Sequence, residues 1–233
     1  MKNVLRKMSI ALLAMVCGVS SMQAQSVNME RYITLNVNNG ATIQLRFCSD
    51  AADTKIKVVT GESENTLTIG NDWTDVRSYT AKANTLTVYG DVSKFNCSAN
   101  LKGVTGVDAS HNEPLQELVC SRNNITSLDI SKNTELTVLT CNNCQLTSLD
   151  LTQNTKLVKL DCKENALTSL DVSKNKQLGW LNCFGNAITS LDLTNNTELE
   201  SLFCFRNAIT KLDVSKKRKI NISKLSYEQT YFA

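Results

Sequence analysis

One phrase of 21 residues recurs about five times between residues 118 and 214, and it constrains the fold of the whole chain. A cysteine returns at a strict 21-residue step, at Cys120, Cys141, Cys162, Cys183 and Cys204. An aspartate keeps the same step, at Asp129, Asp150, Asp171, Asp192 and Asp213. A unit this short cannot bury its own apolar face, so successive units must stack. The sequence therefore predicts a solenoid of about six coils over residues 84–215.

The spacing inside the phrase indicates the kind of coil. Residues 136–146 and 157–167 match the pattern L-x-x-L-x-L-x-x-N/C-x-L place by place, and this pattern is the signature of a leucine-rich repeat. The tripeptide around each Leu-x-Cys core is expected to form a short parallel strand. Its Leu and Cys point inward and the intervening residue points outward. We expect a β-rich solenoid with one parallel strand per coil.

Residues 26–83 lack the phrase and read as β-structure with alternating apolar residues. Asn39-Gly40 separates two such runs and is the favoured two-residue hairpin turn. This segment is predicted to be a small antiparallel β-domain, or alternatively a β-rich cap that is continuous with the solenoid. The repeat is already recognisable at residues 92–100, and residues 216–233 depart from it as a C-terminal tail or partial cap.

Residues 1–24 have the features of a secretory signal peptide, with a positively charged start followed by a short apolar run. A lipoprotein anchored through Cys17 is the alternative, disfavoured by the large Val16 before it. No other segment is apolar enough to span a bilayer. The whole chain has 25 basic and 22 acidic residues, and residues 1–24 contain three of the bases and no acid. The remaining chain is neutral and offers no global attraction to nucleic acid.

The cysteines at the repeat step occupy the place of an inward leucine, so they are expected to act as small buried hydrophobes. Zinc is the alternative for Cys141-x-x-Cys144, but the only histidine, His111, lies far away in the sequence. We predict neither metal nor cofactor. A disulfide between Cys48 and Cys97 is left open.

Two further ladders are expected to be structural. One amide per coil should hydrogen-bond the backbone of its own and the adjacent coil; these are Asn123, Asn165, Asn186 and Asn207. The repeated aspartates should accept a local bond from the following turn. Calcium is the alternative for the aspartates, because hard cations take carboxylate oxygens.

Specificity in a repeat protein is expected where the phrase does not repeat. Outward positions of the first coils are polar, whereas the last two coils carry aromatic residues. The candidate partner-binding residues are Trp180, Phe184, Phe203, Phe205 and Arg206. The alternative is that Tyr227, Tyr231 or Phe232 of the tail folds back and covers them.

The phrase Leu-Thr-Ser-Leu-Asp-Val/Leu-Ser/Thr-x-Asn-x-x-Leu-x-x-Leu-x-Cys-x-x-Asn resembles the repeats of internalin-like, exported bacterial proteins. That resemblance covers residues 85–215. It implies a secreted or cell-surface protein that binds or adheres to another protein, and it transfers no catalytic residue. The alternatives are a carbohydrate-binding protein and a structural surface spacer. An enzyme is disfavoured by the single histidine and the absence of phosphate-loop and nucleophile motifs.

Overall fold

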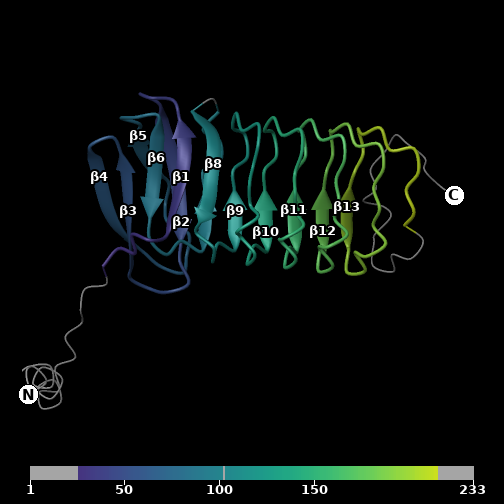
Figure 1. Cartoon of the computed structure of the whole chain (residues 1–233), viewed down its shortest axis with the longest axis horizontal. Helices are drawn as coiled ribbons and strands as arrows, with labels where there is room; N and C mark the ends of the chain where they lie inside the picture. The colour runs from purple at the N-terminus through teal and green to yellow at the C-terminus, as the bar shows by residue number, and fades with distance from the viewer. Residues whose placement is uncertain (1–25, 102, 215–233) are drawn as a thin grey trace, which may run out of the picture.

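The computed structural model describes residues 26–101 and 103–214, which form two β-sheets and contain no helix (Figure 1). The predicted signal peptide with Cys17 and the tail from residue 216 lie outside these residues. The five-stranded sheet has the order β4 (Ser63–Ile69), β3 (Thr54–Thr60), β6 (Thr85–Tyr89), β1 (Tyr32–Val37) and β8 (Val104–His111). The eight-stranded sheet has the order β13 (Ser201–Phe203), β12 (Trp180–Asn182), β11 (Lys159–Asp161), β10 (Val138–Thr140), β9 (Glu117–Val119), β7 (Lys94–Asn96), β2 (Thr42–Cys48) and β5 (Arg77–Thr80).

The N-terminal strands pack two layers of sheet around one apolar core. Alternation places the apolar side chains of β1 and β2 inside, and Ile33, Leu35, Ile43, Leu45 and Phe47 are fully buried. These residues belong to a single core that continues into the solenoid. Facing sheets with alternating inward residues are the usual geometry of a β-sandwich.

The hairpin predicted at Asn39-Gly40 is wrong. A turn is present there, with the Ala41 N–H bonded to the Asn38 carbonyl at 3.0 Å. It joins two different sheets, because β1 pairs with β6 and β8 while β2 pairs with β5 and β7. Only Gly40 of the two central residues has a positive φ, 81°, whereas a type I′ hairpin turn needs two. The tight hairpin lies instead between β3 and β4, where Gly61 has a φ of 58°.

The N-terminal strands continue directly into the solenoid. Strand β2 pairs antiparallel with β7, and β7 pairs parallel with β9. The open edge of the first coil is thus covered by a strand of opposite direction, which protects it from edge-to-edge association. Asn100 bonds β2 in the way that later ladder asparagines bond a preceding coil. Its Oδ1 accepts the Gln44 N–H at 2.7 Å, and its Nδ2 donates to the Gln44 carbonyl at 2.9 Å. This pairing favours the continuous cap over a separate domain.

Strands β9 to β13 stack in parallel and in register along the long axis of the molecule (Figure 1). The central leucine of each strand is inward and at most 1% exposed; these are Leu118, Leu139, Leu160, Leu181 and Leu202. The predicted leucine-rich-repeat solenoid is confirmed.

The cysteine ladder lines the interior as predicted. From Cys97 to Cys183 its members are fully buried, and all eight cysteines of the described residues, including Cys48, are free thiols. Burial raises the pKa of Cys97, Cys141, Cys162 and Cys183 and brings that of the half-buried Cys204 to about 11. The pKa of Cys120 is raised by its hydrogen bond with Cys144 and by burial. The ladder thiols are therefore neutral, apolar side chains.

The predicted asparagine ladder joins adjacent coils. Nδ2 of Asn165 donates to the carbonyls of Cys141 and Cys162, both at 3.0 Å, and its Oδ1 accepts the Leu146 N–H at 3.1 Å. Asn123, Asn186 and Asn207 also bridge two successive cysteine carbonyls. Cys144 replaces the asparagine in one coil, with its Sγ 3.4 Å from the Cys120 carbonyl.

A second asparagine ladder runs along the opposite wall and was not predicted. Its members are fully buried; they are Asn112, Asn133, Asn154, Asn175 and Asn196. Nδ2 of Asn154 donates to the Ile130 and Asn133 carbonyls of the preceding coil at 3.0 and 2.9 Å. The same 21-residue step announces this ladder in the sequence.

Candidate functional site

The outward side chains of the parallel strands form the strand face, on which residues 21 apart are neighbours. Strand register places Trp180 beside Lys159 and Ser201, and Phe203 beside Asn182. The residue after each cysteine extends a third column, which contains Phe184. This geometry brings the predicted aromatic residues onto two adjacent coils.

The four rings pair across β12 and β13 and are here called the aromatic patch. The ring centroids of Trp180 and Phe203 are 5.7 Å apart, and those of Phe184 and Phe205 are 4.2 Å apart, both in tilted arrangements. Such tilted pairs are favourable beyond the area they bury. All four rings remain half-buried, so the patch is packed on one side and open on the other.

Two cations lie over the aromatic patch. Nζ of Lys159 is 5.1 Å from the centroid of the Trp180 ring, and Cζ of Arg206 is 5.3 Å from that of Phe184. Both distances are within the range of a cation–π contact. The structure thus brings Arg206 to the patch as the sequence predicted, and adds Lys159, which the sequence did not single out.

A buried carboxylate borders the patch. Asp161 accepts the Asn142 Nδ2 hydrogen at 3.0 Å and the Lys163 N–H at 3.3 Å. Burial raises the pKa of Asp161, although these bonds and Lys163 and Lys159 oppose that effect. The strand face is therefore electrostatically mixed, with a partly desolvated acid between two lysines.

Arg206 belongs to a column with a left-handed backbone. The second residue after each cysteine has φ between 52° and 66°; these residues are Ala99, Arg122, Asn143, Glu164, Gly185 and Arg206. This conformation costs a residue with a side chain about 1–2 kcal/mol. Only two of the six positions have residues that favour a left-handed backbone, Asn143 and Gly185, so this conformation could not be predicted from residue type. The residues at these six positions differ from coil to coil, so this column is a second variable surface beside the strands.

The aspartate ladder has the predicted local bond. Oδ1 of Asp129, Asp150, Asp171 and Asp192 accepts the N–H two residues later at 2.8–2.9 Å. Asp108, one coil before the predicted ladder, makes the same bond at 2.9 Å. This N–H donor is the main reason that the pKa of Asp129, Asp150 and Asp171 is below its ordinary value. Within residues 26–101 and 103–214, no three His, Cys, Asp or Glu side chains form a group that could hold a metal ion.

Comparison with known proteins finds similarity only among solved structures, since no protein-family model and no curated protein matches the chain. The functional domain of InlJ from Listeria monocytogenes, described as including a cysteine ladder, is 43% identical over 50% of this chain and 26% of that chain, with a TM-score of 0.49. A leucine-rich-repeat protein of Leptospira interrogans is 25% identical over 45% of this chain and 29% of that one, with a TM-score of 0.42. An internalin, InlF of Listeria monocytogenes, is 22% identical over 49% and 41% respectively, with a TM-score of 0.41.

The chain spans less than half the length of each of these proteins. Its own strands and ladders define it as a leucine-rich-repeat solenoid with a cysteine ladder. A cysteine ladder is described for the InlJ domain, and this chain has a cysteine ladder of its own at a 21-residue step.

Proposed function

We propose that this chain is an exported, non-enzymatic binding protein that holds a protein partner on the strand face of its last two coils. The observation that carries the proposal is the aromatic patch with its two cations. Trp, Phe and Arg are frequent anchors in protein interfaces. The four rings are half-buried and form a partly exposed apolar cluster on an otherwise polar strand face, which favours an interaction site. The aromatic rings and the two cations therefore favour binding of a protein partner.

The rest of the described chain offers little for catalysis. The single histidine, His111, is exposed and stacks on Tyr32 at 4.2 Å, away from any ladder cysteine. Within the described ranges, no helix is long and apolar enough to cross a membrane. The positively charged, apolar start of the sequence supports export. A secreted or cell-surface location would bring the strand face into contact with a protein partner outside the cell.

The test removes the patch and keeps the fold. Phe184→Ala/Phe205→Ala in the full chain should weaken partner binding at least about tenfold, because truncating interface anchors costs well over 1 kcal/mol. Val119→Ala/Thr140→Ala is the matched control, since these residues occupy the same face on earlier coils. The partner is captured from host-cell or bacterial envelope proteins with the wild-type chain, identified, purified and titrated against each variant.

The outcomes separate a binding site from an internal cap. Lost binding with an unchanged melting temperature and solubility supports the proposal. Aggregation or unfolding of the Phe184→Ala/Phe205→Ala variant would mean that the patch is an internal contact, as expected if Tyr227, Tyr231 or Phe232 of the tail covers it. Equal losses in both double variants would place the partner on the earlier coils instead.

A further inference from the structure

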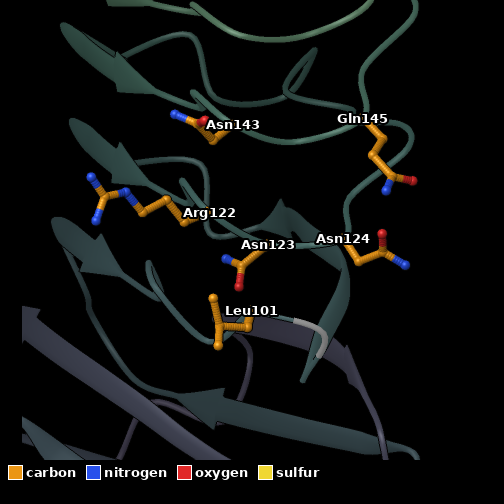
Figure 2. Close-up of a pocket in the computed structure, with 6 residues that line it drawn as sticks. All are labelled: Leu101, Arg122, Asn123, Asn124, Asn143 and Gln145. Carbon is orange, nitrogen blue, oxygen red and sulfur yellow. The ribbon is translucent and has the colours of Figure 1, made fainter.

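A hollow lies where the N-terminal cap meets the first regular coils, far along the solenoid from the aromatic patch. Its volume is about 800 Å³, and it is lined by Leu101, Arg122, Asn123, Asn124, Asn143 and Gln145 (Figure 2). Four of these six residues are carboxamides, and none is acidic or aromatic. The volume is within the 300–1,000 Å³ range of small-ligand sites, and the hollow is broad and open to solvent.

Asn123 contributes an acceptor without a donor. In Asn165, Asn186 and Asn207 the side-chain Oδ1 accepts a backbone N–H from the preceding coil at 3.0–3.1 Å. The Oδ1 of Asn123 has no such partner, although the residue is only 6% exposed. The Oδ1 atoms of Asn112, Asn133, Asn154 and Asn175 in the second ladder are also buried without a donor, so what distinguishes Asn123 is that it lines the hollow. The coil that precedes it is the irregular one, since Cys97 and Cys120 are 23 residues apart. A buried unpaired acceptor costs about 1–3 kcal/mol, and in Figure 2 this oxygen points towards Leu101.

Leu101 faces this acceptor and has two unfavourable features, an exposed apolar side chain and a left-handed backbone. Its side chain is 71% exposed, which is unusual for leucine, and its φ is 51°. A left-handed conformation disfavours residues with a Cβ, and strained residues of this kind cluster at ligand sites. The leucine thus offers an apolar surface in a position where glycine or asparagine would be easier to accommodate.

Asn124 and Gln145 occupy a place in the repeat that does not need an amide. The three later coils have alanine there, at Ala166, Ala187 and Ala208. The backbone bond is the same in all five coils, from this residue's N–H to a carbonyl of the preceding coil at 2.8–3.1 Å. The side chains of Asn124 and Gln145 point towards each other in Figure 2. Their amides are therefore dispensable for the coil and available to a ligand.

We propose that this hollow binds a neutral saccharide. A pyranose ring presents hydroxyl groups at its rim and C–H groups on its faces. Each hydroxyl both donates and accepts, as do the carboxamides of Asn124, Asn143 and Gln145. One hydroxyl donates to Asn123 Oδ1, and a C–H face covers Leu101. A peptide is the weaker match, because the lining lacks the aromatic anchors that the patch on β12 and β13 provides.

The experiment titrates the full chain with cellotriose, maltotriose, lactose and N,N′-diacetylchitobiose, and follows the side-chain amide resonances of Asn124, Asn143 and Gln145. At least one saccharide is expected to shift these resonances in a saturable way. Asn124→Ala/Gln145→Ala should weaken that saccharide about tenfold, the loss of roughly two hydrogen bonds. Its fold should be intact, because alanine already stands at this place in three coils.

Two further variants make the test specific. Leu101→Asn should keep or raise the melting temperature, because asparagine tolerates a left-handed backbone, and should still lose affinity for the saccharide. Arg206→Ala, at the same place as Arg122 four coils later, should leave saccharide affinity unchanged.

Three results would overturn the proposal. In the first, none of the four saccharides shifts these amides, so that water alone satisfies Asn123. In the second, Arg206→Ala abolishes saccharide binding, which would move the site to the aromatic patch. In the third, the peptide acetyl-Glu-Leu-Glu-Leu-amide shifts the amides and the saccharides do not. The first and third results leave the protein partner proposed for the last two coils unaffected.

Discussion

The interior of the solenoid and its strand face share one 21-residue period, but only the interior repeats its residues. Inside, the ladder asparagine of one coil bonds the backbone of its own coil and of the preceding coil. Asn186, for example, bonds the carbonyls of Cys162 and Cys183. A substitution inside therefore disturbs two coils. On the strand face, Thr140, Asp161 and Asn182 succeed one another with different chemistry in the same register.

This difference shows where the fold constrains sequence and where it does not. The ladder asparagines donate to two fixed carbonyls, and no other side chain of similar size offers the same pair of donors. Cys144 is the one exception among the coils from Asn123 to Asn207, with its Sγ 3.4 Å from the Cys120 carbonyl. An outward side chain needs only to avoid its neighbours. Function can therefore change coil by coil on the strand face without cost to the stack. Substitutions of the same type at an interior position and at an outward position test this difference most directly.

The largest effect is expected inside, at Asn186→Ala. This change removes the Nδ2 bonds to the Cys162 and Cys183 carbonyls and leaves the Leu167 N–H without its side-chain acceptor. The expected loss in the free energy of unfolding is about 2–4 kcal/mol, measured by urea denaturation. Asn195→Ala, an exposed asparagine in the next coil, should change it by less than about 0.5 kcal/mol. Equal effects of the two variants would remove the distinction between interior and surface.

The cysteine ladder should tolerate an apolar residue better than a polar one of its own size. Cys162→Ala should cost about 1–2 kcal/mol, because it leaves a small cavity. Cys162→Ser should lower the free energy of unfolding more, by about 2–3 kcal/mol, because the serine hydroxyl is buried without a hydrogen-bond partner. The unfolding free energies of both variants decide the order. If serine were the milder change, the ladder would not be the neutral hydrophobic column that its burial indicates.

Periodicity carried most of what the sequence could predict. Cys162, Asn165 and Asp171 each lie at a fixed offset in the phrase, and the offset determines whether a side chain points inward or outward. The predicted bonds of Asn165 and Asp171 are therefore the ones observed. The second asparagine ladder, which contains Asn175, has the same 21-residue step and is therefore also predictable from the sequence.

Outside the repeat, local pattern was insufficient. Asn39-Gly40 has the composition of a hairpin turn, but β1 pairs with β6 and β8, which lie 50 or more residues further along the chain. Such pairing depends on which sheet faces the solenoid core, and no local motif encodes that choice. The hollow was missed for a related reason. It depends on an unpaired Asn123 oxygen and on Leu101, both consequences of an irregular coil.

On the strand face, replacing the buried acid should stabilise the protein slightly. Burial raises the pKa of Asp161, so its ionised form is disfavoured in the folded state. That penalty is absent below the carboxyl's ordinary pKa and builds up as the pH rises through the raised value. Asp161→Asn should therefore raise the unfolding free energy at neutral pH, by up to about 1 kcal/mol, with little change in strong acid. Asn182 already occupies this place in the next coil. A loss of stability at neutral pH would mean that Lys159 and Lys163 compensate the buried charge.

The aspartate ladder on the edge of the coils should respond to pH in the opposite sense, with the smallest effect. Backbone N–H donors lower the pKa of Asp129 and Asp171, so their ionised forms stabilise the fold above the ordinary carboxyl pKa. That contribution is lost as the pH falls through the lowered values. Asp129→Asn/Asp171→Asn keeps the acceptor oxygens and removes their titration. Compared with the wild type, this variant should melt slightly lower at pH of about 7 and lose less stability on acidification to about pH 2.5. Parallel melting curves at both pH values would show instead that repulsion between successive carboxylates cancels the bonds.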